Sequence, residues 1–329
     1  MKTLVTGANG FVGSAVMRHL LHANHEVRVL VRPHSDRRNL ADMPVEIHEG
    51  DLRDPVGLKK AVSGCDNLFH VAADYRLWVP DPTTMYATNV NGTRELILAS
   101  ADAGINKIIY TSSVATLGLN TDGRPANEET PSSLDQMVGH YKRSKFLAEQ
   151  EVKKLTIEHK LPVIIVNPST PIGPRDIKPT PTGRIVLDTL RGEMPAYVNT
   201  GLNIVHVDDV AQGHLLAYEH GQIGERYILG GENLSLKTVL EEIDNITGKP
   251  VNRIQLPHNL LIPVAALMEL WASISGREPR ATMDSIRMSK KLMYFSSDKA
   301  KSQLHYHPRP AIEGIRDAIV WFTENNYCS

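Results

Sequence analysis

Two side chains near the middle of the chain, Tyr141 and Lys145, have the spacing Y-x-x-x-K. Residues four apart in a helix lie on the same face, so a phenol and an ammonium group would stand together. A free tyrosine has a pKa of about 10 and exchanges protons poorly at neutral pH, but a nearby cation stabilises the phenolate. The pair would then exchange a proton with a carbinol or carbonyl oxygen during hydride transfer. Because this spacing is common by chance, it needs support from other residues.

A serine-rich segment supplies a second polar group. The run YTSSVATLG places Ser112 and Ser113 just after an expected strand at 107–110, at the carboxyl edge of a sheet where active sites form. Either hydroxyl would polarise the oxygen that Tyr141 protonates. Asn89, in the helix expected before that strand, would anchor a water or a backbone carbonyl beneath the lysine.

A glycine loop follows the first expected strand, in the sequence TGANGFVG. Two glycines permit a tight turn and a close backbone approach, the third lets helix and strand pack closely, and the helix N-terminus offers amides to a pyrophosphate. An ordinary strand–turn–helix corner is the alternative, but the preceding strand and the following apolar helix favour a dinucleotide. The predicted contacts in this loop are Gly7, Asn9, Gly10, Phe11, Val12 and Gly13.

The end of the second expected strand indicates which dinucleotide binds. Enzymes that prefer NAD usually have an acidic residue there, which accepts from the ribose 2′-hydroxyl. This chain has Arg32, with Arg37 and Arg38 following. A guanidinium suits a 2′-phosphate, so the sequence predicts NADP, with NAD second. The alternative is that these arginines lie on a solvent-facing loop.

Further cofactor contacts are expected along the same edge. Asp51 follows the third strand, where its carboxylate would accept from the adenine amine, and small residues end the fourth strand. The predicted contacts beyond the glycine loop and Arg32 are Asp51, Leu52, Val71, Ala72, Ala73 and Pro168, with Tyr141 and Lys145 at the reactive end.

The elements that must position these groups alternate between apolar strands and longer helices, which is typical of a parallel sheet with crossover helices. We expect strands at 3–5, 27–31, 45–48, 67–71, 107–110 and 163–166, and helices at 11–23, 55–62, 85–103 and 141–159. Residues 167–181 hold five prolines and predict a loop that leaves the sheet. Helical segments then follow at 183–190, 208–220, 236–247, 259–275 and 310–325.

The predicted fold class is therefore α/β: a Rossmann-type doubly wound parallel sheet with a smaller mixed α/β substrate lobe formed mainly by the C-terminal half. Residues 1–167 would form the NADP-binding domain, and 203–229 would return to it. Residues 168–202 and 230–329 would form most of the substrate lobe.

The bulk composition excludes several classes of protein. A net charge of −1 over 329 residues gives no field that attracts nucleic acid or an anionic membrane. Cys65 and Cys328 are too few and too far apart for a disulfide scaffold or a cysteine metal site, and we predict no metal. The apolar run 260–271 is too short to span a bilayer. The start MKTLVTG predicts a strand at once and leaves no room for a secretory signal, so we expect a cytoplasmic protein.

These motifs together resemble the extended short-chain dehydrogenase/reductase family. Those that carry the likeness are TGANGFVG, GDL at 50–52, the Asn89 region, SSVATLG, YKRSK, NPSTPIGP at 167–174 and HVDDV at 206–210. The phrases VAADYRLW, NPSTPIGPRDIKPTPTGRI and RYILGGENL make the chain most similar to hopanoid-associated sugar epimerases, close to dihydroflavonol 4-reductases. The resemblance implies a catalytic triad of Ser113, Tyr141 and Lys145, with Asn89 in support. It also implies a homodimer formed through the helices at 85–103 and 141–159.

Two positions depart from relatives within that family. Sugar-nucleotide dehydratases carry an Asp-Glu pair after the catalytic Ser or Thr, where this chain has Val114 and Ala115, so dehydration is disfavoured. Nucleotide-sugar 4-epimerases have an arginine that grips the diphosphate four residues before the histidine of H-V-x-D, where this chain has Leu202, followed by Asn203. A nucleoside-diphosphate sugar would therefore lose a major anchor.

Two features of the second half leave alternatives open. Three basic residues would either meet an anionic substrate or face solvent near a loop, and the run 260–271 would either line an apolar pocket or form a buried helix. The basic residues are Arg175, Lys178 and Arg184.

The sequence thus predicts a reductase or sugar epimerase that transfers hydride at a secondary alcohol or ketone of a sugar-like or polyol substrate, with a role in hopanoid biosynthesis implied by the resemblance. One alternative is a dihydroflavonol 4-reductase-like enzyme that reduces a non-sugar ketone. Another is a sensor that binds dinucleotide without catalysis. Sensors tend to lose the tyrosine or the lysine, and both are present here.

Overall fold

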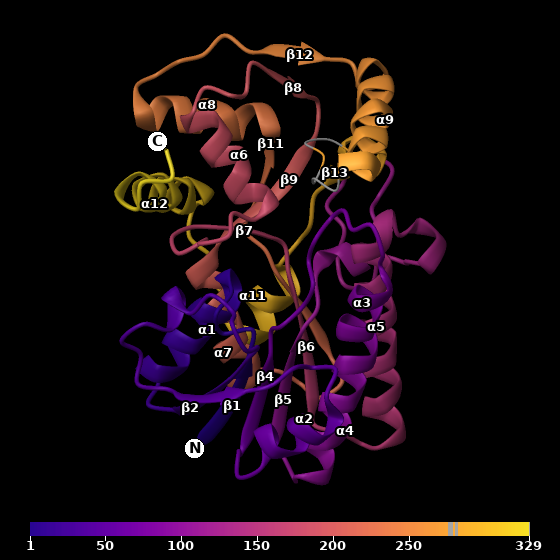
Figure 1. The fold of residues 1–329 in the computed structure, drawn as a ribbon, viewed down its shortest axis with the longest axis vertical. Coiled ribbons are helices and arrows are strands. Elements are labelled where there is room, and N and C mark those ends of the chain that lie inside the picture. Colours follow the sequence, from indigo (N-terminus) through magenta and orange to yellow (C-terminus); the bar gives the residue numbers. More distant parts are fainter. Residues whose placement is uncertain (276–278, 280–281, 329) are drawn as a thin grey trace.

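The computed structural model describes residues 1–275, 279 and 282–328, and its larger part is a seven-stranded sheet in the order β10-β6-β5-β4-β1-β2-β3 (Figure 1). Every ladder in this sheet is parallel. The predicted doubly wound α/β fold is confirmed. The strands are β1 Lys2–Thr6, β2 Glu26–Val31, β3 Glu46–Glu49, β4 Asn67–His70, β5 Lys107–Thr111, β6 Val163–Pro168 and β10 Arg226–Leu229.

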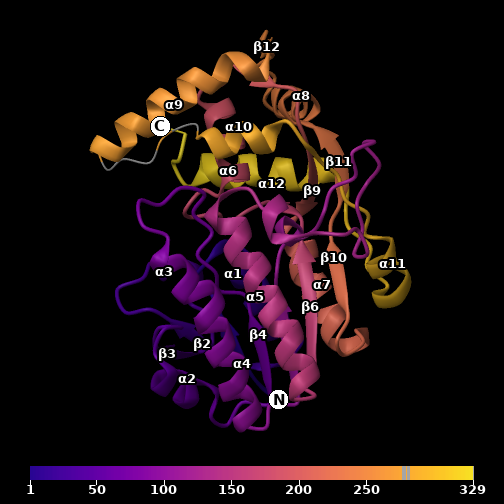
Figure 2. The same ribbon diagram turned by 90° about the vertical axis from the view of Figure 1, so that its right-hand side faces the viewer.

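Helices cover both faces of this sheet because its central strands are apolar on both sides. Leu4 and Ile108 pack in one core cluster with α2 (Pro55–Val62), α4 (Thr93–Asp102) and α5 (Gly139–Glu158). The next residue of each strand, Val5 or Ile109, points to the opposite cluster with α1 (Phe11–His22) and α7 (Val207–His220). Figure 2 shows α4 and α5 side by side on the outer surface. The near-continuous apolar sequence of these strands follows from this two-sided burial.

The single helix expected at 85–103 is instead interrupted. It consists of α3 (Thr83–Tyr86), a π-helical turn at Ala87–Gly92 and then α4. Asn89 lies in the wide turn, and Gly92 packs so closely on Leu52 that a Cβ there would lie 2.9 Å from the Leu52 carbonyl oxygen. Single π-turns occur often at functional sites because they redirect one side chain.

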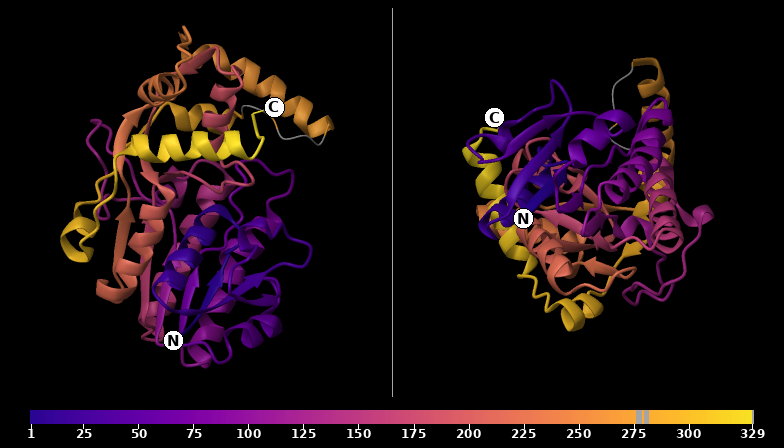
Figure 3. Two further views of the ribbon diagram at one scale, coloured as in Figure 1. Left: turned by 90° about the vertical axis from the view of Figure 1, so that its left-hand side faces the viewer. Right: turned by 90° about the horizontal axis from the view of Figure 1, so that it is seen from below.

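The second lobe contains a smaller sheet, in which β9 (Gly201–His206) pairs with β7 (Thr170–Ile172), β11 (Glu232–Ser235) and β13 (Leu292–Met293). A separate pair joins β8 (Ala196–Val198) to β12 (Ile254–Leu256). Figure 1 shows this lobe beyond the carboxyl ends of the large sheet's strands, opposite the N-terminus, and Figure 3 shows the yellow C-terminal helix lying across the boundary. Its helices are α6 Pro181–Leu190, α8 Leu236–Thr247, α9 His258–Ser275, α10 Met283–Ser289 and α12 Ala311–Glu324.

The chain crosses between the two parts more than once. Of the segment 203–229, α7 and β10 join the large sheet, whereas the residues up to His206 lie in β9 of the smaller sheet. From the segment 230–329, α11 (Asp298–Leu304) packs on α7 and β10, because Ala300 and Leu304 belong to the large core. The second lobe is therefore built from several separate segments of the chain.

Two further searches cover the described residues. None of the helices there is long and apolar enough to cross a membrane. Among the same residues, no group of three or more histidine, cysteine or acidic side chains is arranged to hold a metal ion. Cys65, which is buried, and Cys328 are both free thiols.

Candidate active site

The glycine loop between β1 and α1 has the shape that a dinucleotide requires. Gly7 has φ +74°, and a Cβ there would lie 2.7 Å from the Ala72 amide nitrogen. A Cβ on Gly13 would lie 2.1 Å from the Gly7 carbonyl oxygen. Gly10 caps α1 without a side chain, so no side-chain oxygen occupies the first amides of the helix. An anionic diphosphate fits these open amides and the positive end of the helix dipole.

The end of β4 is fixed next to this loop by a buried chain of polar groups. The Thr6 hydroxyl oxygen accepts from the amides of Val71 (3.2 Å) and Ala72 (3.1 Å) and lies 2.7 Å from His70 Nδ1. His70 Nε2 lies 2.9 Å from the Thr93 hydroxyl. Burial, helped by the Lys145 charge, lowers the pKa of His70 to about 3, so its ring is neutral. The predicted cofactor edge at Val71 and Ala72 is therefore held rigidly against the loop.

The three arginines near the second strand have different surroundings. Arg37 binds the Glu49 carboxylate, and Arg38 binds Asp36, with 2.7 Å between Nη2 and Oδ2. The exposed side chain of Arg32 has no hydrogen-bond or ion-pair partner among the described residues. Arg32 is thus the arginine of this group that remains available to a ligand.

Asp51, expected at the adenine, is engaged within its own turn. Its carboxylate receives Arg53 Nη2 at 2.7 Å, and this bond is the main reason why the pKa of Asp51 lies below its usual value. The bond leaves Asp51 ionised and beside the glycine loop's edge of the sheet, next to the buried Leu52.

The two serines after β5 have different partners. The Ser112 hydroxyl donates to Glu149 Oε2 at 2.6 Å and is buried. The Ser113 hydroxyl accepts from the Ala115 amide at 3.1 Å, and the Ser113 side chain acts to lower the pKa of Tyr141, against the larger effect of burial. The structure therefore brings Ser113 to Tyr141 and turns Ser112 away from it.

Tyr141 and Lys145 lie on α5 as the spacing predicts, but the ammonium group has other partners. Lys145 Nζ donates to the Thr111 carbonyl at 2.8 Å and to the Tyr110 hydroxyl at 3.3 Å. Burial lowers the pKa of Lys145 to about 8, against the opposing effect of Glu149. Burial raises the pKa of Tyr141, against the opposing effect of the Ser113 side chain. The expected lowering of the phenol pKa by Lys145 is absent from this structure, and Tyr141 is a neutral proton donor in it.

Asn89 binds the segment after β4 and the start of α5. Its Nδ2 donates to the Asp74 carbonyl at 2.9 Å and to the Ser144 hydroxyl at 3.0 Å, while its Oδ1 accepts from the Asp74 amide at 2.7 Å. Asn89 thus binds a backbone carbonyl, that of Asp74. This is not the carbonyl that Lys145 contacts, because the ammonium group of Lys145 donates to Thr111. Asn89 positions the loop that leads from the cofactor edge.

The sequence analysis missed Glu149, which is 1% exposed and gathers the ends of β5 and β6. Burial alone would raise its pKa, but Lys153, Ser112 and Arg226 together lower that pKa to about 2. Helical spacing held a signal, because Tyr141, Lys145 and Glu149 are four residues apart and share one face of α5. Its partners are Ser112 (2.6 Å), Thr116 (2.8 Å), Lys153 (2.8 Å), Asn167 (3.0 Å) and Arg226 (3.1 Å).

At the end of β6, two buried polar atoms make no hydrogen bond within the described part of the chain. Pro168 ends this strand opposite Leu229 of β10. Next to it, the Ser169 hydroxyl and Asn167 Oδ1 are buried with no hydrogen-bond partner within the described part of the chain. Buried polar groups are nearly always paired, so these atoms fit the polar end of a bound ligand, such as the carboxamide of a nicotinamide.

Comparison with known proteins identifies the family of this chain. The model of the NAD dependent epimerase/dehydratase family covers residues 3–230, which is more than half of the chain. The chain belongs to the NAD dependent epimerase/dehydratase family. It is an enzyme of this group and uses a nicotinamide dinucleotide.

Two curated relatives and one solved structure match almost the whole chain. The chain is 44% identical over 327 residues to "Putative dihydroflavonol 4-reductase" of Synechocystis sp., covering 98% of this chain and 95% of the relative. It is 33% identical to "Sterol demethylase protein B" of Methylococcus capsulatus, covering 98% and 99% of the two chains. The crystal structure of gox2253 superposes with a TM-score of 0.90 at 58% identity and covers 99% of both chains.

The place where epimerases of the family carry a diphosphate-gripping arginine is filled by structural residues here. Leu202 in β9 packs against the core of the second lobe. Asn203 is fully buried, and its Nδ2 donates to Asn233 Oδ1 at 2.8 Å and to the Phe295 carbonyl at 3.2 Å. Neither side chain offers a positive charge to a diphosphate.

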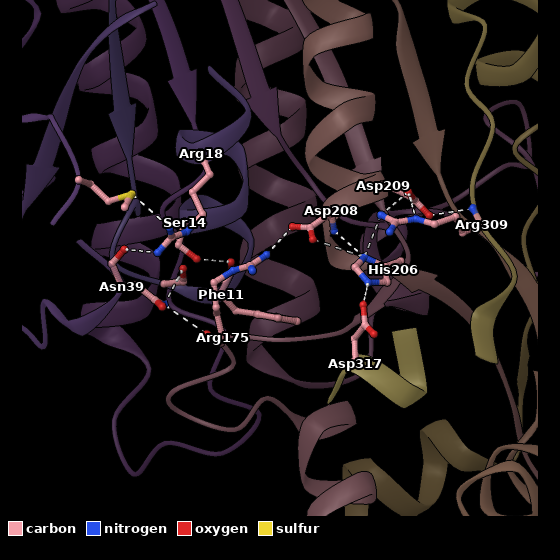
Figure 4. Close-up of polar contacts among 12 residues, drawn as sticks. Phe11, Ser14, Arg18, Asn39, Arg175, His206, Asp208, Asp209, Arg309 and Asp317 are labelled. Atoms are coloured by element: carbon pink, nitrogen blue, oxygen red, sulfur yellow. Dashed lines mark hydrogen bonds and ion pairs between the residues drawn. The ribbon is translucent and has the colours of Figure 1, made fainter. Parts of the chain in front are cut away.

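The family's H-V-x-D segment joins the two parts of the molecule (Figure 4). His206 Nε2 lies 3.1 Å from Asp317 Oδ2, and Asp209 binds Arg309 at 2.8 Å. Arg175 pairs with Asp208 at 2.5 Å. Because its guanidinium is already engaged in this ion pair, the alternative that Arg175 binds an anionic group of the substrate is disfavoured. Asn39 Nδ2 donates to the Arg175 carbonyl at 3.2 Å, which ties this loop to the glycine-loop side.

Proposed function

We propose that this protein is an NADP-dependent reductase that converts a ketone to a secondary alcohol. The observation that carries the proposal is the placement of Tyr141 and the buried Lys145 on α5, with Ser113 at the end of β5 close enough to act on the Tyr141 pKa. Hydroxyl groups so placed hold a carbonyl oxygen and protonate it as hydride arrives. A bound nicotinamide would supply that hydride.

Each of the three residues has a separate role in this proposal. Ser113 holds the substrate oxygen, and Tyr141 donates the proton to it. Lys145 lies 2.8 Å from the Thr111 carbonyl and supplies positive charge beneath the phenol when negative charge develops there. Glu149 fixes Ser112 and Asn167 and so sets the strand ends that carry Ser113.

Three observations support reduction over sugar-nucleotide epimerisation or dehydration. Leu202 and Asn203 take the place of the diphosphate anchor. Val114 and Ala115 form a short helical turn where dehydratases carry two acids. A relative that covers nearly the whole chain carries the name of a reductase.

Net consumption of the cofactor tests this proposal. The purified enzyme with NADPH should oxidise one equivalent for each alcohol formed, measured by absorbance and by product analysis. The panel contains dihydroflavonols, sterol-derived ketones and open-chain sugar ketones, following the names of the relatives and the sugar-like substrates expected from the sequence. Isomer exchange without net NADPH loss would instead establish epimerisation and contradict the reductase.

The preference for NADP rests on Arg32, whose guanidinium is exposed and uncommitted among the described residues. Arg32→Asp should raise the KM for NADPH relative to NADH by about 10- to 100-fold, because it removes a charge-assisted bond to the 2′-phosphate. Arg124→Asp, at an exposed arginine paired with Asp122, is the control and should leave the ratio unchanged. An unchanged ratio in the Arg32 variant would show that this arginine does not read the 2′-phosphate.

The proposal also includes the enzyme's location in the cell, its pathway and its oligomeric state. We propose that the enzyme acts in the cytoplasm on a small molecule, as the sequence predicts, and that it serves hopanoid biosynthesis, as the family resemblance implies. We also propose a homodimer through α4 and α5, which pack side by side on the outer surface and leave Ile157 exposed (Figure 2).

A further inference from the structure

A small pocket lies beside the reactive hydroxyls. Its walls come from the loop after β5, the segment leading into α5 with the first turn of that helix, and α10 with the two residues after it. The space open to the centre of a water-sized sphere measures about 30 Å³, enough for a carboxylate-sized group and too small for a sugar or nucleotide. The pocket is lined by Ala115, Leu117, Leu119, Gln136, Met137, Val138, Lys142, Met288 and Lys291.

Two of these walls are joined directly to the reactive residues. Ala115 donates its amide to the Ser113 hydroxyl at 3.1 Å. Lys142 follows Tyr141 on α5. These connections place the pocket next to the residues proposed to hold the carbonyl, and the proposal below takes the group in the pocket and that carbonyl to belong to one molecule.

Two lysines face this pocket without an acidic partner. Neither ammonium group, of Lys142 or of Lys291, has a hydrogen bond or ion pair with any residue that the structure describes. Burial, and then the charge of Lys291, lower the pKa of Lys142 to about 8. The nearby acid on α10, Asp284, pairs with Arg287 at 3.3 Å. Two like charges placed together cost free energy that a bound anion would recover.

We propose that this pocket binds a carboxylate of the substrate between Lys142 and Lys291, so that the enzyme reduces an oxo-acid whose chain between carbonyl and carboxylate is apolar. The proposal rests on the reductase function proposed above. It adds a substrate class to that function.

The apolar residues that line the rest of the pocket favour a carboxylate carried on an apolar chain. Leu117 and Leu119 are buried or nearly so, and Met137 and Met288 complete an apolar wall. Such a wall favours an alkyl or ring segment, and it disfavours a strongly hydrated phosphate dianion, which would have to lose its water. Methionine side chains also adapt to different apolar shapes.

Calorimetric binding to the holoenzyme tests the pocket without turnover. Hexanoate is titrated into the wild-type protein saturated with NADP, with hexanamide as the neutral probe and inorganic phosphate as the competing anion. We expect Lys142→Met and Lys291→Met each to weaken hexanoate binding by about tenfold or more, because each removes a charge-assisted contact. Hexanamide should bind all variants equally, and phosphate should bind more weakly than hexanoate.

The matched control is Lys290→Met, which removes an exposed lysine next in the chain whose Nζ lies 3.4 Å from Asn259 Oδ1. It should bind hexanoate like the wild type. Lys142→Arg keeps the charge and should restore most of the affinity. Equal hexanoate affinity in the wild type and both methionine variants, or no binding to the wild type, would overturn the proposal.

The result separates the pocket from the reductase function. Lysine-dependent binding of hexanoate in a protein that reduces neither these ketones nor an oxo-acid with an apolar chain would support the pocket and contradict the reductase. Reduction of neutral ketones with lysine-independent binding would support the reductase and contradict the pocket. Unchanged NADPH affinity and thermal midpoint in each variant would show that it is folded.

Discussion

Tyr141→Phe is expected to lower kcat by a factor of about 10² to 10⁴ and to leave the Kd for NADPH nearly unchanged. The phenol is the proposed proton donor, and burial raises its pKa, so it carries its proton at neutral pH. The open amides expected to bind the cofactor lie in the first turn of α1, after Gly10, and this change does not touch them. Single-turnover kinetics with NADPH and a substrate ketone measure the first quantity, and fluorescence titration of NADPH measures the second.

Tyr110→Phe is the matched control, because it removes another phenol that contacts Lys145 at 3.3 Å from a fully buried position on β5. Lys145 keeps its 2.8 Å bond to the Thr111 carbonyl in that variant, so kcat should fall by less than about tenfold. Wild-type turnover in Tyr141→Phe would refute the assignment of proton transfer to Tyr141.

The large sheet followed from sequence because its strands are short apolar runs separated by clear helices. Six of its seven strands were predicted within two residues at each end, and for the central strands burial on both faces leaves a strong signal. The seventh strand, β10, was missed because it follows the chain's departure into the other lobe, outside the regular alternation of strands and helices that marked the other six. The seven-residue helices α10 and α11 have too few turns for an amphipathic pattern.

The candidate site was predictable only in part. Spacing was enough to place Tyr141 and Lys145 on one face of α5, and chain order placed Ser113 near them. Spacing does not show which groups an ammonium meets in three dimensions, so the bond from Lys145 to Thr111 required the folded chain. The convergence on Glu149 depends on residues up to 77 positions away, and no local pattern reports such contacts.

The pocket at Lys142 could not be predicted from the sequence either. Lys142 lies in the motif YKRSK, where attention falls on the tyrosine and the final lysine. Its partner in the pocket, Lys291, comes from a segment after α10 that sequence reasoning did not recognise as an element. Lys142 and Lys291 line one pocket only because the second lobe packs on the start of α5, and no local sequence pattern reports that packing.

Glu149→Gln is expected to lower the free energy of unfolding by about 3 kcal/mol at pH 7. The amide removes the charge that Lys153 and Arg226 meet at 2.8 and 3.1 Å, and it leaves Arg226 without its carboxylate partner on α5. The magnitude agrees with the depression of the Glu149 pKa from 4.5 to about 2, at about 1.4 kcal/mol per unit. Urea unfolding followed by circular dichroism measures the change.

The pH dependence gives this prediction its sign. The folded-state pKa of Glu149 is depressed, so its contribution is complete above its ordinary value of 4.5 and is lost as the pH falls towards 2. The gap between wild type and Glu149→Gln should therefore be constant from pH 7 to about 5 and narrow below that. Glu151→Gln, two residues along α5 at a partly exposed pair with Arg94, should cost less than about 1 kcal/mol. A gap as large at pH 3 as at pH 7 would contradict a contribution from the depressed pKa, because at pH 3 the carboxyl of the unfolded chain is protonated and much of that contribution must be lost.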